Sequence, residues 1–261
     1  MDQNGELIFL GTGTSQGIPV IGCECEVCLS EDPKDQRYRS SVHFAFNGIG
    51  IQIDTGPDFR SQMLREGLHQ VDAVLFTHEH QDHIAGLDDV RPMIFRTKKA
   101  MPLYGQERVI ARIKKAFHYA FEEQPYPGAP KFDVHSIDEF DTLNIEGIFV
   151  QPIPVYHGQL PILGYRIGDM AYITDVKTVP DASLEKLQGL KTLVFDALHH
   201  YPHQSHCTLE EAVKWAKIIG AENTYFIHLS HHMGAHELTE AQLPEGMHIA
   251  YDGLRLPVKL G

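Results

Sequence analysis

The chain has 261 residues, and its hydrophobic fraction of 43% is enough for a large α/β domain with a buried core. The chain has 22 Lys and Arg residues and 35 Asp and Glu residues. The resulting net charge of −13 disfavours unaided binding to a long nucleic acid or an anionic membrane. No apolar run reaches the roughly 20 residues that span a bilayer, and the acidic start lacks a signal-peptide core, so we expect a cytoplasmic location.

The predicted strands are short apolar runs at 7–10, 42–46, 49–53, 73–76, 148–155, 171–173, 192–195 and 224–227. The clearest helix covers 208–219, where apolar residues repeat on one face and Thr208 with Glu211 forms a capping box. The proline-rich stretch 121–131 predicts a loop. Strands dominate the early part and alternate with helices later, so we expect two packed sheets with helices outside, in a single domain over residues 1–261.

Cys23, Cys25 and Cys28 lie within six positions of one another. In a reducing compartment such spacing indicates a metal site rather than a disulfide framework. The three thiolates require a fourth ligand to complete a structural zinc site. Arg37 and Arg39, which follow this segment, are interpreted as solvated surface side chains rather than phosphate contacts.

Four potential metal ligands follow the buried run at 73–76: His78, His80, Asp82 and His83. A strand end places side chains rigidly, and His78 and His80 can turn to one ion while Asp82 and His83 supply ligands to a second ion nearby. The pattern therefore predicts a site for two divalent cations.

The sequence His78-x-His80-x-Asp82-His83 resembles the signature of the metallo-β-lactamase superfamily. The remaining positions of that signature are filled in order, each after an expected strand, by His157, Asp175 and His228. The resemblance implies a four-layer αβ/βα sandwich with the metals at one edge between the sheets. It also implies two active-site ions, zinc or manganese, whose bridging hydroxide attacks the substrate.

The resemblance also assigns each ligand. One ion would be held by His78, His80 and His157, the other by Asp82, His83 and His228, with Asp175 between them. Asp82 is then needed for catalysis as well as for binding. Asp54 also matches a family position, and we expect it to support a metal-binding imidazole from outside the ligand sphere.

His206 lies 22 residues before His228 and directly before the predicted helix. This arrangement resembles the phosphodiesterase branch shared by tRNase Z and the PhnP-type enzymes, which implies that His206 contacts phosphate and protonates the leaving group. Free backbone N–H groups at a helix start would favour the anion. His199, His200 and His203 have no comparable spacing and are interpreted as loop residues, and Cys207 as a plain thiol.

The cysteine segment narrows the resemblance to the PhnP-type phosphodiesterases and their PqqB-like relatives. In the PhnP type the fourth ligand of the structural zinc is a histidine three residues after the last active-site histidine, which is His231 here. His232 and His236 remain rivals for that place.

These observations favour an enzyme that hydrolyses a small phosphodiester, with a cyclic phosphate or nucleotide-like substrate implied by the resemblance. Two alternatives stay open. One is a tRNA 3′-processing endonuclease, which the charge of −13 disfavours. The other is a noncatalytic PqqB-like metal-binding protein, which the full set of seven ligands disfavours. The sequence leaves the oligomeric state open, with a homodimer as one candidate.

Overall fold

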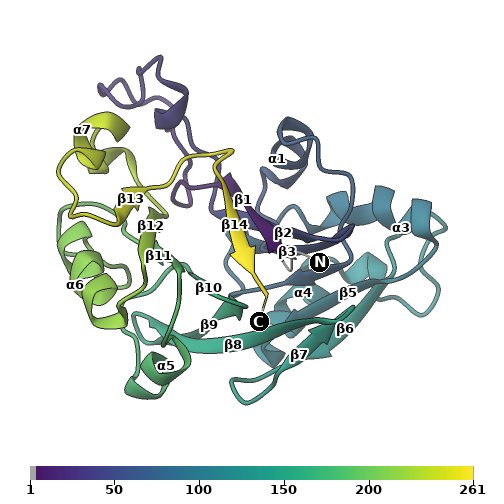
Figure 1. The fold of residues 1–261 in the computed structure, drawn as a ribbon. Coiled ribbons are helices and arrows are strands. Elements are labelled where there is room, and N and C mark those ends of the chain that lie inside the picture. The colour runs from purple at the N-terminus through teal and green to yellow at the C-terminus, as the bar shows by residue number, and fades with distance from the viewer. Residues whose placement is uncertain (1–3, 261) are drawn as a thin grey trace.

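A computed structural model describes residues 4–260, which form two seven-stranded sheets packed face to face. Helices cover the outer face of each sheet (Figure 1). The order is thus helix, sheet, sheet, helix. The predicted four-layer αβ/βα sandwich is confirmed, and no helix within residues 4–260 is long and apolar enough to cross a membrane.

The first sheet has the order β14-β1-β2-β3-β4-β5-β6. Its strands are β1 (Asn4–Gly11), β2 (Ser41–Phe46), β3 (Ile49–Ile53), β4 (Ala73–Leu75), β5 (Met101–Gly105), β6 (Phe132–Ser136) and β14 (Arg255–Lys259). Helices α1 (Phe59–Arg65), α3 (Arg91–Thr97) and α4 (Glu107–Ala116) supply apolar side chains to its outer face.

The second sheet has the order β13-β12-β11-β10-β9-β8-β7. Its strands are β7 (Leu143–Ile145), β8 (Ile148–His157), β9 (Leu160–Ile167), β10 (Met170–Ile173), β11 (Thr192–Asp196), β12 (Asn223–Ile227) and β13 (Met247–Ile249). Its outer face packs against α5 (Asp181–Lys186) and α6 (Leu209–Ile219). The short helices α2 (Gln81–Ile84) and α7 (His236–Glu240) lie at strand ends.

Strand β1 shows why a continuous apolar run becomes a central strand. Successive side chains point to opposite faces. Leu7 and Phe9 enter the core between the sheets, whereas Ile8 and Leu10 enter the core beneath the helices. Because both faces are buried from Leu7 to Leu10, this part of the strand has no polar residue.

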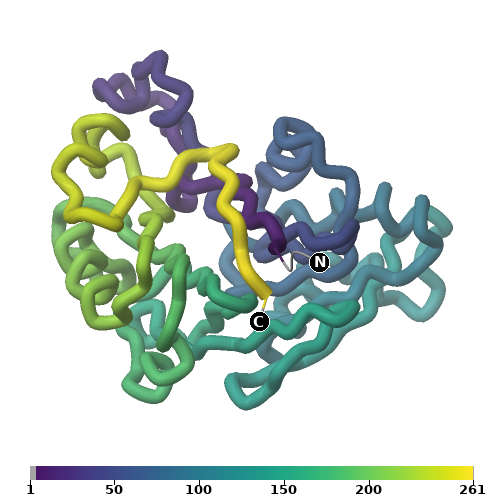
Figure 2. Tube along the Cα trace, in the orientation of Figure 1, coloured from purple at the N-terminus to yellow at the C-terminus, as the bar shows by residue number. Residues whose placement is uncertain are grey.

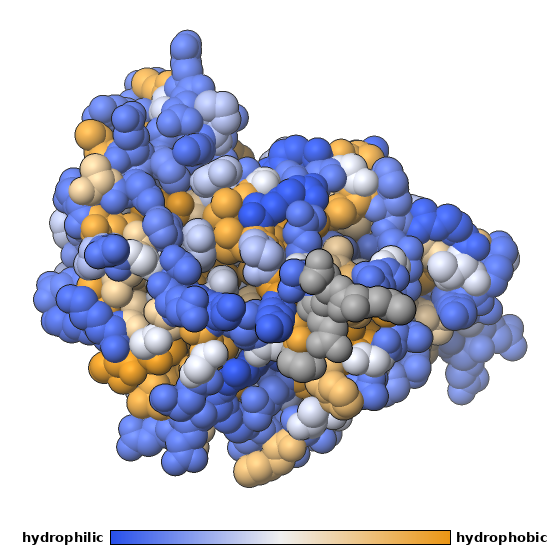
Figure 3. All heavy atoms as spheres, in the orientation of Figure 1, coloured by the Kyte–Doolittle hydropathy of each residue, from blue (hydrophilic) through white to orange (hydrophobic). Residues whose placement is uncertain are grey.

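The first and last strands are neighbours in the first sheet. β1 and β14 run antiparallel, with Asn4 opposite Lys259 and Ile8 opposite Arg255. In Figure 2 the start of β1 (purple) and the end of β14 (yellow) lie close together. On the face seen in Figure 3, hydrophilic residues predominate and apolar side chains form small groups.

All eight predicted strands are present, and β3 and the helix after Thr208 have the expected bounds to within one residue. Thr208 caps α6 with Glu211 in the predicted capping box. Residues 121–131 contain no helix or strand. The sequence analysis missed six strands: β5, β6, β7, β9, β13 and β14.

Candidate metal centre

Histidine and aspartate side chains from several strand ends converge at one edge between the sheets. His78 and His80 follow β4, His157 ends β8, Asp175 follows β10 and His228 follows β12. Asp175 and His228 have φ angles of 56° and 60°, and Asp54, after β3, has 62°. Non-glycine residues rarely adopt this left-handed conformation, which persists where surrounding contacts hold it.

The first group of ligand atoms comes from His78, His80, His157 and Asp175, all within 4.8 Å of one another. His78 Nε2 is 2.9 Å from His80 Nδ1. His157 Nδ1 donates to the Ser205 carbonyl at 2.9 Å, which leaves Nε2 as the ligand nitrogen of that ring. Three imidazole nitrogens and a carboxylate oxygen thus face one point, a suitable donor set for zinc or manganese.

The second group comprises Asp82, His83, Asp175 and His228. His83 Nε2 lies 3.2 Å from Asp82 and 3.3 Å from Asp175 Oδ1, and His228 Nε2 lies 3.4 Å from Asp175 Oδ2. Within residues 4–260 these two buried Nε2 atoms have no hydrogen-bond partner. Buried unsatisfied nitrogens beside carboxylates fit a cation site, because a bound ion would satisfy all of them.

Asp175 belongs to both groups, as the sequence predicts for the bridging carboxylate. The seven side chains are called the His/Asp cluster below: His78, His80, Asp82, His83, His157, Asp175 and His228. The structure brings together every residue that the sequence analysis assigned to the two ions.

The carboxylates of the His/Asp cluster set its protonation. Burial lowers the pKa of His83, but Asp175, Asp82 and Asp54 outweigh it and raise that pKa well above its ordinary value. Burial also lowers the pKa of His228, but Asp175 and the other nearby carboxylates outweigh it and raise that pKa to about 9. Without a metal, protons on these two rings therefore supply the positive charge that the carboxylates require.

Asp54 supports two imidazoles from behind. It accepts hydrogen bonds from His83 Nδ1 at 2.7 Å, from the Thr77 amide at 2.9 Å and from the Thr77 hydroxyl at 2.8 Å. Thr77 Oγ1 in turn lies 3.0 Å from His78 Nδ1. These bonds turn the Nε2 atoms of His78 and His83 toward the cluster, the supporting position expected for Asp54.

His206 lies against the His/Asp cluster but outside its ligand groups. Its ring is stacked on His228 with centroids 4.6 Å apart, and Nε2 is 3.9 Å from Asp175 Oδ2. The free N–H groups expected at the start of α6 are already used: the Thr208 amide donates to Glu211, and the Glu211 amide donates to Thr208. The helix start therefore offers less to an anion than the sequence analysis assumed.

Asp196 is the residue that the sequence analysis missed. It ends β11 and is fully buried. His206 Nδ1 donates to its Oδ1 at 3.2 Å, His228 Nδ1 lies 3.3 Å from the same oxygen, and the Cys207 amide donates to its other oxygen. The Asp196 carboxylate thus orients the His206 ring and lies beside the His228 ring. The only signal in the sequence was an acidic residue directly after the apolar run 192–195.

The cysteine segment forms a separate candidate zinc site. His231 Nδ1 lies 3.2, 3.4 and 3.5 Å from the sulfurs of Cys23, Cys25 and Cys28. A tetrahedral zinc with the usual bond lengths separates sulfur from nitrogen by about 3.6 Å. The Cys28 amide also lowers the pKa of the Cys25 thiol to about 6. Of the rival histidines, His232 is exposed, and His236 faces Arg37 at 3.3 Å.

The interpretation of Arg37 as a solvated surface residue is wrong. Arg37 is only 5% exposed, and its guanidinium donates to Thr12 and to the Ala250 carbonyl, which ties the cysteine segment to the core. Arg39 is partly exposed and pairs with Asp58 at 2.9 Å. The Arg37 guanidinium is therefore not available to bind phosphate, and the charge of Arg39 is offset by Asp58.

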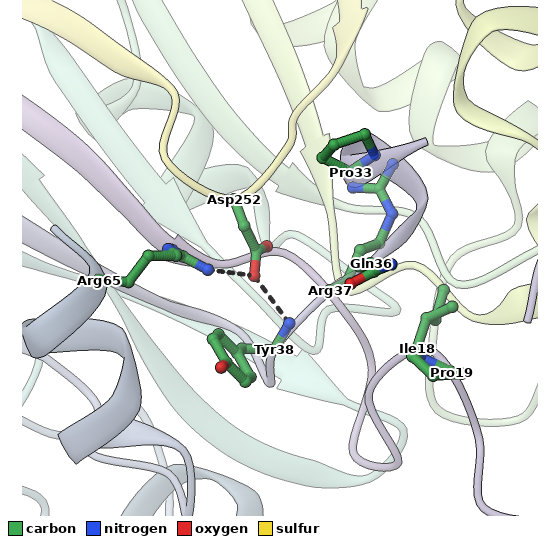
Figure 4. A pocket seen from close by; sticks show the side chains of 8 residues that line it. All are labelled: Ile18, Pro19, Pro33, Gln36, Arg37, Tyr38, Arg65 and Asp252. Carbon is green, nitrogen blue, oxygen red and sulfur yellow. Dashed lines mark hydrogen bonds and ion pairs between the residues drawn. The ribbon is translucent and has the colours of Figure 1, made fainter. Parts of the chain in front are cut away.

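A cavity of about 310 Å³ lies beside the Arg37 backbone, but its polar groups are already paired (Figure 4). Asp252 accepts from Arg65 at 3.0 Å and from the Tyr38 amide at 2.8 Å. It also accepts from Thr12. Because its charges are internally neutralised, this cavity is a weaker candidate for substrate binding than the edge with the His/Asp cluster.

Comparisons with known proteins agree with this arrangement. A family model described as a β-lactamase superfamily domain matches residues 50–229. A crystal structure of a diphosphatase from the PhnP family is 44% identical, covers 100% of this chain and 99% of its own, and superposes with a TM-score of 0.93. Human tRNase Z, short form, is 18% identical over 96% of this chain and 98% of its own, with a TM-score of 0.72, and so shows the shared fold alone.

A further relative carries a different name. The octanoyltransferase of Porphyromonas gingivalis is 41% identical over 249 residues, which are 95% of this chain and 50% of that protein. The chain thus spans about half the length of this relative, and the name describes a protein twice as long.

Proposed function

Because the chain belongs to the β-lactamase superfamily domain family, we propose that it is a dinuclear metal-dependent hydrolase of small phosphodiesters. The observation that carries the proposal is the position of Asp175, shared by two ligand groups, with His206 against both. The sequence analysis favours a cyclic phosphate or nucleotide-like substrate. Because the chain is similar to a PhnP-family diphosphatase, a compound with a diphosphate linkage is a further candidate substrate.

The His/Asp cluster would hold the two ions, zinc or manganese, in the groups described above. When bound, two such ions lower the pKa of a shared water and neutralise charge on the phosphoryl oxygens. The protein's own side chains orient the metal ligands and supply the proton for the leaving group. Asp54 orients His83 directly and His78 through Thr77, and Asp196 orients His206.

His206 is the proposed proton donor. When a water oxygen attacks phosphorus, the bond from phosphorus to the leaving oxygen breaks and that oxygen requires a proton. His206 Nδ1 donates to Asp196 at 3.2 Å, so Nε2 is the atom that faces the cluster and would release the proton. The hydrogen bond to the Asp196 carboxylate holds the His206 ring in this orientation.

A small substrate is favoured over tRNA by the charge of the chain. A net charge of −13 opposes the contacts with many phosphates on which binding of a long nucleic acid depends. The octanoyltransferase name of the longer relative does not alter this proposal, because the His/Asp cluster is a donor set for cations.

The proposal is tested by loading the protein with zinc or manganese and measuring turnover of bis(p-nitrophenyl) phosphate, cyclic nucleotides and a precursor tRNA. We expect hydrolysis of the small diesters and none of the tRNA. Selective cleavage of tRNA would support the endonuclease instead. Absence of turnover on every substrate, with both ions bound, would contradict an enzymatic role.

A further inference from the structure

A second group of histidines lies beside the His/Asp cluster, on the loop between β11 and α6. Neighbouring ring centroids are 4.5 Å apart from His157 to His206, 5.1 Å from His206 to His203 and 5.8 Å from His203 to His199. The row thus leads outward from the proposed reaction centre. His199 and His203 belong to neither ligand group.

The loop and the turn between β8 and β9 enclose a cavity of about 590 Å³ at this place. Its lining residues are His157, Gly158, Gln159, Pro202, His203, Gln204 and Ser205. His157 is therefore shared between the cavity and the His/Asp cluster. A substrate whose scissile phosphoryl group lies at the cluster can extend its other half into this cavity.

Two contacts hold the cavity walls together. His157 Nδ1 donates to the Ser205 carbonyl at 2.9 Å. Gly158 has a φ of 61°, and a Cβ there would come within 3.3 Å of Ser205 Cβ. The positive φ and the close approach favour glycine at this turn, and the His157 side chain ties the turn to the Ser205 backbone.

The hydrogen bonds of His199 and His203 define which ring nitrogen is a donor. His199 Nδ1 accepts from the Tyr201 amide at 3.2 Å, and His203 Nδ1 accepts from the Ser205 amide at 3.3 Å. A ring that accepts at Nδ1 carries its proton at Nε2. Among residues 4–260 the structure shows no hydrogen-bond partner for either Nε2, so each ring keeps an N–H donor for a ligand.

We propose that His203, with His199 behind it, binds a second phosphoryl group of the substrate, next to the one that is hydrolysed. The preferred substrate would then be a diester of diphosphate, with one phosphoryl group at the His/Asp cluster and the other in the cavity. This inference rests on the proposed function, because it assumes that the scissile phosphoryl group lies at the cluster. Each of the two rings offers an N–H group. Because N–H groups donate hydrogen bonds to phosphoryl oxygens, the two rings suit an anionic ligand.

The test compares two non-hydrolysable probes, methylenediphosphonate and methylphosphonate, by calorimetric titration of the metal-loaded protein. In the unaltered protein methylenediphosphonate should bind more tightly. His203→Ala should reduce that preference by about tenfold, the effect of a lost hydrogen bond to a charged group. His203→Gln should restore most of it, because the glutamine amide places an N–H group at a similar reach.

His118→Ala is the matched control, since His118 is an exposed histidine in the short 3₁₀ helix that follows α4, on the outer side of the first sheet. It should leave the preference unchanged. If His203→Ala also keeps the full preference, the second subsite is wrong even when bis(p-nitrophenyl) phosphate is hydrolysed. If the preference falls in that variant but no phosphodiester is turned over, the subsite stands and the proposed function fails.

Discussion

Asp175 is the carboxylate around which several histidines of the site are arranged. It is buried, and its two oxygens approach three imidazoles of the His/Asp cluster at 3.3 to 3.8 Å. Burial alone would raise its pKa, but His228 and His83 hold the pKa well below its ordinary value. The carboxylate therefore stays charged and available to a cation at neutral pH.

Removal of one ligand should abolish catalysis without unfolding the protein. Asp82→Ala and His80→Ala each delete a ligand at the partly exposed side of the cluster, so the core should be retained. We expect kcat on bis(p-nitrophenyl) phosphate to fall below about a tenth of its original value, with the circular dichroism spectrum unchanged. Retention of more activity than this, with metal supplied, would show that two ions are not required.

His206→Ala should lower kcat by about 10² to 10⁴ while metal content stays constant, because the ring donates a proton but holds no ion. The loss should be smaller for a p-nitrophenolate leaving group, which needs less protonation. Equal losses on good and poor leaving groups would restrict His206 to phosphate binding. Asp196→Asn should reproduce part of the loss, because it keeps the shape but weakens the hydrogen bond that orients the His206 ring.

Metal binding should be coupled to proton release. Metal ligation requires neutral imidazole, whereas in the metal-free protein the pKa of His83 is raised well above its ordinary value and that of His228 is raised to about 9. At pH 7 two protons must therefore leave before both rings can bind their ion. The apparent affinity for that ion should rise by up to about a hundredfold per pH unit between pH 6.5 and 8.5, and titration calorimetry in buffers of different ionisation enthalpy should detect the released protons. A pH-independent affinity would contradict this protonation state.

The residues of the His/Asp cluster were predictable for two reasons. Four of them lie within six positions of the sequence, and the other three each follow a predicted strand in the order of the metallo-β-lactamase signature. Asp196 was not, since it has no partner within ten residues except His206, and its role depends on β11 and β12 lying side by side. Arg37 was misjudged for a related reason. Its partners Thr12 and Ala250 lie 25 and 213 residues away in sequence, and only the fold brings them together.

At the level of elements, most predicted strands carry apolar runs, and β8 was predicted despite Pro152 and Pro154 because apolar residues surround both. The missed strands carry residues that weaken that pattern: β5 and β14 contain Pro102 and Pro257, and β9 contains Pro161 and Gly164. A Cβ at Gly164 would come within 2.7 Å of the Tyr172 carbonyl. The glycine that obscures the strand in the sequence is thus required by its close packing against β10.

The cysteine site connects two elements that are distant in sequence, the loop after β1 and the segment after β12. Cys25→Ser should remove one zinc ion per chain and lower the melting temperature by about 5 °C or more, because a cross-link between distant segments is lost. Activity at temperatures where the variant is folded should remain. Elemental analysis and calorimetry measure both effects.

Cys207→Ala is the control for that variant. Cys207 is a buried thiol against the Lys177 carbonyl, far from the cysteine site in sequence, so its removal should leave zinc content unchanged. Wild-type zinc in Cys25→Ser would refute the assignment, as would a structure in which His232 or His236 completes the sphere.

At the level of the whole molecule, the antiparallel pairing of β1 with β14 has a consequence for how the chain can be rearranged. Residues that face each other in such a pair have Cα atoms roughly 5 Å apart, so a short linker can join the two ends. The new ends can open at Gly147, an exposed glycine in the turn between β7 and β8. We expect this circular permutant to fold and keep its metal content, whereas a permutant opened between Glu79 and His80 should lose it. Since Asn4 and Lys259 belong to none of the metal-binding loops, a linker between them should leave those loops as they are.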